Sequence, residues 1–157
     1  MSHETVTHEH LRKAAVRWLT NSRKCSVVIS EMVSAAWECP DAIGWKSGYS
    51  ILVECKASRS DLFANAKKPT LEGDRGVGCA RYFMIPKGLA SVDDMARFDG
   101  YGLLLMDGDR VTVALNANLR ETNRHNEILM LTSALRRVKT REFLTVVPFH
   151  ANESGEQ

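Results

Sequence analysis

The chain has 157 residues, of which 44% are hydrophobic and 25% charged, and it contains only 4 prolines. This length and composition are typical of one globular domain and exclude a fibrous or low-complexity protein. The formal net charge of +2 does not by itself indicate a nucleic-acid partner, and no apolar run reaches the roughly 18 residues of a membrane span. The polar start lacks the apolar segment of a signal peptide, so we expect a cytoplasmic protein without a membrane partner.

The first part of the chain has the apolar spacing of a helix with one buried face. This face carries Leu11, Ala14, Ala15, Trp18 and Leu19. Thr7 is the expected N-cap, and the helix is expected to end near Asn21 and Ser22. Apolar and β-branched segments then predict three strands over residues 25–32, 37–46 and 50–57, with a hairpin turn near Gly48.

The rest of the chain alternates between helix and strand signals. Ser58 predicts a helix cap before a helix that runs to about Lys67, and the polar residues 68–78 predict a loop. We expect a strand over 81–85, a short helix capped by Ser91, a hairpin of strands 101–106 and 110–115, and a helix from Asn123 to Val138. This order predicts an α/β fold with a mixed central sheet flanked by helices. Residues 1–150 are expected to form one domain, with a disordered tail over 151–157.

The third predicted strand carries two charged residues that share one face. Successive side chains of a strand point to opposite sides, so Glu54 and Lys56 lie about 6.5–6.8 Å apart on one side and Cys55 points to the other. A hairpin connection brings Asp41 beside Glu54. Two adjacent carboxylates repel each other unless a cation lies between them, and oxygen ligands suit Mg²⁺ or Mn²⁺.

The ammonium group of Lys56 lies beside this predicted centre and is able to stabilise an oxyanion or orient an attacking water. The alternative is that Glu54 and Lys56 form a solvated ion pair with no chemical role. The apolar flanks Ile51, Leu52 and Val53 argue against full exposure, because unpaired charges are costly in a buried strand.

Pro40-Asp41, followed after twelve residues by Glu54-Cys55-Lys56, resembles the signature of PD-(D/E)xK nucleases. The predicted helix before the motif and the helix and strand after it follow the order of that superfamily. Three further stretches resemble the MmcB-like DNA-repair branch and small phage-borne relatives: 54–62, 81–88 and the Gly-Leu-Leu run from Gly102. The resemblance covers roughly residues 27–140.

This resemblance implies a restriction-endonuclease-like core and hydrolysis of DNA phosphodiester bonds, in DNA repair or phage DNA processing. It implies that Asp41, Glu54 and the main-chain carbonyl of Cys55 bind Mg²⁺ or Mn²⁺, and that Lys56 assists the reaction. A further acidic residue joins the site in many members. Glu31 is the favoured candidate, and Glu38 competes with it.

Nucleic-acid contacts and alternative functions are also expected from the sequence. Basic residues after the motif are predicted to hold DNA phosphates, namely Arg59, Lys67, Lys68 and Arg75. We expect His3, His8 and His10 to be exposed polar residues rather than metal ligands. A catalytically silent DNA-binding accessory and a protein-interaction adaptor remain open, since a fold does not determine function. The oligomeric state also stays open, a homodimer included.

Overall fold

A computed structural model describes residues 5–36, 38–65, 76–138 and 144–146. Within these ranges the centre is a seven-stranded sheet in the order β6-β5-β4-β3-β2-β1-β7. Strands β3, β4 and β5 run parallel, and the other neighbours are antiparallel. The strands are β1 Val27–Ser30, β2 Ala42–Lys46, β3 Tyr49–Cys55, β4 Ala80–Pro86, β5 Gly102–Asp107, β6 Arg110–Leu115 and β7 Leu144–Val146.

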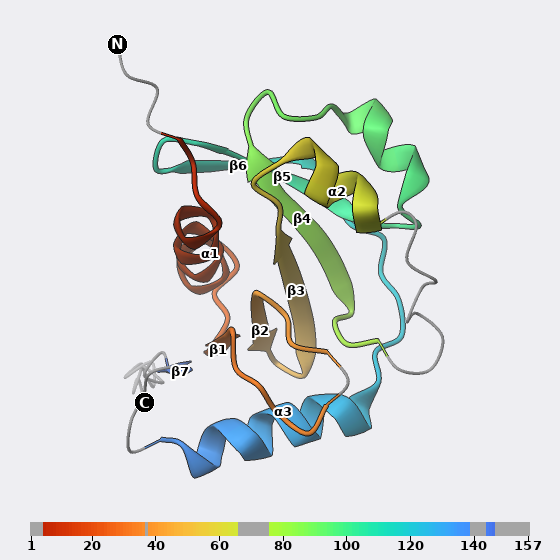
Figure 1. The fold of residues 1–157 in the computed structure, drawn as a ribbon. Coiled ribbons are helices and arrows are strands. Elements are labelled where there is room, and N and C mark those ends of the chain that lie inside the picture. Colours follow the sequence, from red (N-terminus) through yellow and green to blue (C-terminus); the bar gives the residue numbers. More distant parts are fainter. Residues whose placement is uncertain (1–4, 37, 66–75, 139–143, 147–157) are drawn as a thin grey trace, which may run out of the picture.

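Helices cover both faces of this sheet (Figure 1). Val53 of β3 packs in one apolar cluster with α1, whereas its neighbour Leu52 packs with Met130 of α3. Leu62 of α2 packs with Phe83 of β4 in a third cluster. Because neighbouring residues of a strand point to opposite faces, α1 lies on one face and α2 and α3 lie on the other. The helical elements are α1 His8–Arg17, the π-helical turn η1 Trp18–Ser22, α2 Arg59–Asn65, the 3₁₀ helix η2 Val92–Arg97 and α3 Arg124–Arg136.

The predicted α/β class, with a mixed sheet flanked by helices, is confirmed, and the arrangement is compatible with a restriction-endonuclease-like core. Thr7 caps α1, because its hydroxyl accepts a hydrogen bond from the His10 amide at 3.3 Å. Ser58 likewise accepts one from the Asp61 amide at 3.2 Å. No helix in the described ranges is long and apolar enough to cross a membrane. The tail predicted over 151–157 lies outside the described residues.

Some sequence-based strand boundaries were wrong, and one strand was missed. β1 ends at Ser30 rather than at residue 32, because Glu31 has a positive φ of 48° that interrupts the extended backbone. β2 begins at Ala42 rather than at residue 37. β7, at the edge of the sheet beside β1, was not predicted at all.

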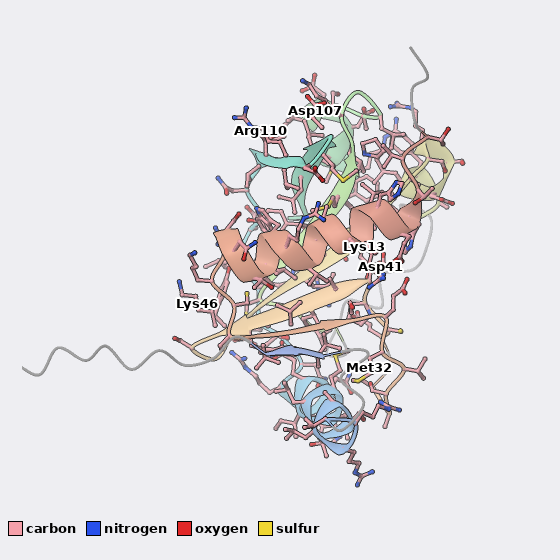
Figure 2. The ribbon with its side chains drawn as sticks, turned by 90° about the vertical axis from the view of Figure 1, so that its left-hand side faces the viewer. Lys13, Met32, Asp41, Lys46, Asp107 and Arg110 are labelled. Carbon is pink, nitrogen blue, oxygen red and sulfur yellow. The ribbon has the colours of Figure 1, made fainter. Side chains whose placement is uncertain are left out.

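The chain topology places the carboxyl ends of several strands on the same side of the sheet, at the ends of the strands. β4 and β5 run parallel to β3, and β1 has the same direction because two antiparallel pairings separate it from β3. The carboxyl ends of β1, β3, β4 and β5 therefore lie at the same end of the strands. In Figure 2, α1 lies across the sheet with Asp41 near one of its ends and Lys46 near the other.

Candidate functional site

The β2–β3 hairpin places Asp41 opposite Glu54. Its register pairs Ala42 with Val53, so the next residues outward, Asp41 and Glu54, face each other across the two chains. Side chains at such opposed positions are within contact distance. One oxygen of Asp41, Oδ2, accepts a hydrogen bond from the Cys55 amide at 2.7 Å, which fixes the orientation of this carboxylate. The structure thus brings together the two carboxylates expected from the sequence.

Glu54 lies in an environment that opposes its negative charge. Burial is the main cause that raises the pKa of Glu54 to about 8, and the charge of Asp41 is the next. Glu38 raises the same pKa further, whereas the positive charge of Lys56 lowers it. Ionised Glu54 beside ionised Asp41 is therefore unfavourable in the protein alone. A bound cation would relieve this repulsion, so the donor set fits a divalent metal ion.

Glu127 of α3 is a carboxylate with a structural role, and its burial and hydrogen bonds can be compared with those of Glu54. Its side chain is only 3% exposed. It accepts hydrogen bonds from Trp45 Nε1 at 3.2 Å, from the Gly78 amide at 3.3 Å and from the Ser50 hydroxyl. Among the described residues, no N–H group makes a comparable hydrogen bond to Glu54. Buried Glu127 and half-buried Glu54 thus differ in kind, because N–H and O–H donors satisfy Glu127 and a second carboxylate faces Glu54.

Lys56 follows directly after β3 and continues the parallel ladder. Its amide donates a hydrogen bond to the Met84 carbonyl at 2.9 Å. Its side chain is half-buried, and its charge acts on Glu54. Within the described ranges, however, no carboxylate forms an ion pair with Lys56. The alternative in which Glu54 and Lys56 serve as a mutual ion pair therefore finds no support in the geometry.

Glu31 and His8 lie beside Asp41 on its outer side. The Glu31 amide donates to the Asp41 carbonyl at 3.3 Å, so Glu31 lies next to Asp41 at the end of β1. The imidazole of His8, at the start of α1, has its Nε2 atom 3.1 Å from Asp41 Oδ1 and its Nδ1 atom 3.7 Å from Glu31 Oε1. His8 and Glu31 are each 46% exposed and Asp41 is 16% exposed, so the group is open to solvent.

Glu38, the competing acidic candidate, is held elsewhere. Its Oε1 atom lies 3.2 Å from the buried guanidinium of Arg81, and its Oε2 atom accepts from the Val77 amide at 3.3 Å. Its charge still acts on Glu54, but the geometry places Glu31, not Glu38, in the group around Asp41.

The thiol of Cys55 takes no part in this group. Its side chain is buried in the cluster beneath α1, and this burial raises the pKa of the thiol. Only the main chain of Cys55 is on the side of the carboxylates, through the amide that binds Asp41. The expected role of the Cys55 carbonyl as a metal ligand stays a prediction.

Arg59 is bound within the protein. Its guanidinium makes two hydrogen bonds to the carboxylate of Asp94, at 3.1 and 3.2 Å, and one to the Leu89 carbonyl at 3.1 Å. The hydrogen bond from Arg59 and that from the Ser91 amide lower the pKa of Asp94 to about 2. Arg59 thus connects α2 with η2, and its hydrogen bonds to Asp94 would compete with contacts to a nucleic-acid phosphate. Lys67, Lys68 and Arg75 lie outside the described residues.

Sequence reasoning missed the contact of His8 with the carboxylates. His8 is exposed, as expected, but its imidazole lies against Asp41. His8 and Arg12 share one side of the helix because they are four residues apart, but this spacing does not identify what the two side chains contact. Arg12 also contacts Glu31, with its Nε atom 3.3 Å from Oε2.

Comparisons with known proteins show the fold alone. No protein-family model matches the chain, and no curated protein matches it. A solved structure, the SPO1766 protein of unknown function from Silicibacter pomeroyi, is similar with a TM-score of 0.58. The similarity spans 88% of this chain and 94% of that chain at 19% sequence identity. The shared architecture extends over almost the whole of both chains.

Proposed function

We propose that the chain is a metal-dependent nuclease that hydrolyses phosphodiester bonds of DNA, with Asp41, Glu54 and Lys56 in its active site. The observation that carries this proposal is the placement of Asp41 opposite Glu54 at the end of the hairpin, with Lys56 directly after it. The resemblance of these residues to the PD-(D/E)xK signature supports the same activity. It also suggests a cytoplasmic role in DNA repair or phage DNA processing.

Each residue has a separate part in the proposed reaction. Asp41 and Glu54 offer carboxylate oxygens to Mg²⁺ or Mn²⁺, with the carbonyl of Cys55 as a further ligand. The ion, when bound, supplies a Lewis acid for the phosphate and the attacking water. The Cys55 amide holds Asp41 in one orientation. Lys56 carries a positive charge beside the carboxylates, where it orients the water or stabilises the charge that develops on the phosphate.

Basic side chains are the groups expected to bind the DNA backbone. The interaction of Arg59 with Asp94 reduces its suitability as a phosphate ligand in the free protein. Lys67, Lys68 and Arg75 follow α2 in the chain, and we assign the backbone contacts to them. Changing all three to Ala should weaken DNA binding evenly across sequences and flatten its dependence on salt, because phosphate contacts release counterions.

The deciding experiment is a cleavage assay with purified protein on single-stranded, double-stranded and branched DNA. We expect cleavage with Mg²⁺ or Mn²⁺, none in EDTA, and none for Asp41→Asn. Asp93→Asn is the matched control, since Asp93 is an exposed acid of η2 remote from the hairpin. Full activity in EDTA, or in Asp41→Asn, would contradict the proposal. DNA binding without any cleavage would favour a silent accessory protein.

A further inference from the structure

His8, Glu31 and Asp41 form a compact group of potential metal ligands from three separate parts of the chain. One ligand atom from each lies within 4.8 Å of the others. His8 is the first residue of α1, Glu31 follows β1, and Asp41 precedes β2. Glu54 is not part of this group. The group therefore combines two carboxylates with an imidazole, which comes from a helix that packs on the sheet.

Each carboxylate of the group has one oxygen fixed by the protein and the other turned toward His8. In Asp41 the Cys55 amide binds Oδ2 at 2.7 Å, and Oδ1 lies 3.1 Å from His8 Nε2. In Glu31 the Arg12 guanidinium lies 3.3 Å from Oε2, and Oε1 lies nearest to His8. Such outer donors orient the ligands of protein metal sites. Here they leave one oxygen of each carboxylate near the imidazole, Asp41 Oδ1 beside Nε2 and Glu31 Oε1 beside Nδ1.

The backbone of Glu31 gives independent support. Its φ of 48° lies in the left-handed region, which a residue with a β-carbon rarely adopts. Such strain persists where the surrounding structure imposes it, and it is concentrated at functional sites. In Glu31 this conformation ends β1 and leaves the side chain beside Asp41 and His8. At the other side, the Thr7–His10 capping box fixes the first turn of α1, which carries His8.

We infer that His8, Glu31 and Asp41 bind a divalent transition-metal ion, with Mn²⁺ as the representative ion. Two ligands at about 2.1 Å from an ion and at right angles to each other lie about 3.0 Å apart. The 3.1 Å between His8 Nε2 and Asp41 Oδ1 allows this separation, although a hydrogen bond between the same atoms has a similar length. An imidazole nitrogen favours transition metals over Mg²⁺, which prefers oxygen ligands and bound water. The site therefore selects Mn²⁺ over Mg²⁺.

This inference goes beyond the proposed nuclease function. It shares Asp41 and the candidate ligand Glu31 with the proposed active site, but it adds His8, concerns metal binding by the free protein and needs no nucleic acid. The competing explanation of the same contacts is a protonated His8 that forms ion pairs with Asp41 and Glu31. That arrangement predicts no metal affinity dependent on His8, so the two explanations differ in a measurable quantity.

The test is titration of the metal-free full chain with Mn²⁺, followed by electron paramagnetic resonance of the free ion, and with Mg²⁺, followed by calorimetry. His8→Ala should lower the Mn²⁺ affinity by about tenfold or more, since loss of even an outer partner has an effect of that order. Its Mg²⁺ affinity should change less. Glu31→Gln should weaken Mn²⁺ binding as well. His125→Ala, which removes an exposed imidazole from α3, is the matched control and should change neither affinity.

A second readout uses the unmodified protein and is unaffected if a variant folds poorly. Substoichiometric Mn²⁺ should broaden the imidazole NMR signals of His8 and leave those of His125 sharp. Absence of Mn²⁺ binding, or unchanged Mn²⁺ affinity in both folded variants with no broadening of His8, would overturn the inference. Mn²⁺ binding that depends on His8 in a protein that cleaves no DNA would uphold it and reject only the nuclease proposal.

Discussion

Asp41 faces Glu54 across the β2–β3 hairpin, and the Glu54 carboxyl is at once partly buried and next to a second negative charge. Burial and the Asp41 charge raise the pKa of Glu54 to about 8. Because of this raised pKa, the free energy of unfolding of the metal-free protein decreases as pH rises.

Glu54→Gln should stabilise the metal-free protein at alkaline pH. Between the ordinary pKa of about 4.3 and the raised value of about 8, the folded state holds a proton on Glu54 that the unfolded state has lost. The free energy of unfolding therefore falls as pH rises through this window, and the loss is complete above it. Thermal melts in EDTA at pH 5 and pH 9 give the difference in melting temperature between the variant and the original protein. This difference should favour the variant by about 2 °C or more at pH 9 relative to pH 5. An equal difference at both pH values would contradict the prediction.

Lys56→Ala should abolish cleavage while leaving the fold and metal binding intact. The fold should stay intact because no described carboxylate depends on Lys56 for an ion pair, so its removal leaves no buried partner charge. Lys46→Ala, at the other end of the hairpin, is the matched control and should retain full activity. Turnover measured beside metal affinity and a thermal melt separates the roles. A large loss of stability, with activity following the folded fraction, would indicate a structural residue instead.

Glu127→Ala should destabilise the protein without a specific effect on catalysis. The substitution removes the carboxylate that accepts hydrogen bonds from Trp45 Nε1 and the Ser50 hydroxyl, whereas the Gly78 amide keeps Thr122 Oγ1 as an acceptor at 2.9 Å. An unsatisfied buried donor costs about 1–3 kcal/mol, so a clear decrease in unfolding free energy is expected in urea. Cleavage per folded molecule should not change. A reduced rate in fully folded Glu127→Ala protein would argue that this end of β3 influences the site.

The contact between Arg59 and Asp94 should protect the η2 region against acid. The lowered pKa of Asp94 means that its contribution to stability is fully present above about pH 3.9 and is lost as pH falls toward about 2. Asp94→Asn should remove this contribution. The difference in melting temperature between the two proteins should therefore be constant above pH 4 and should shrink below it. A difference that persists at pH 2 would show that the ion pair is not its origin.

The sequence predicted the parts of the site that depend on strand alternation. Glu54 and Lys56 follow from their spacing, and the hairpin turn near Gly48 brings Asp41 to Glu54. The contact of His8 was not predicted, because helical periodicity identifies the buried face of α1 and says nothing about what its exposed start touches. β7 has three residues, too few to show alternation. The left-handed Glu31 carries no sequence signal comparable to a glycine.

Glu127, which contacts the start of β3, and Glu54, near the end of β3, should differ in how readily they are replaced. Glu127, bound to Ser50 at the start of the strand, has little to gain from substitution, because its two oxygens separately accept hydrogen bonds from the Ser50 hydroxyl and Trp45 Nε1. Glu54, near the end, is the reverse, because neutral replacements remove a repulsion. Laboratory evolution for thermal tolerance alone, without a requirement for activity, should therefore replace Glu54 early and retain Glu127. The order in which these positions change would show which of the two residues is retained in the natural sequence although it lowers the stability of the fold.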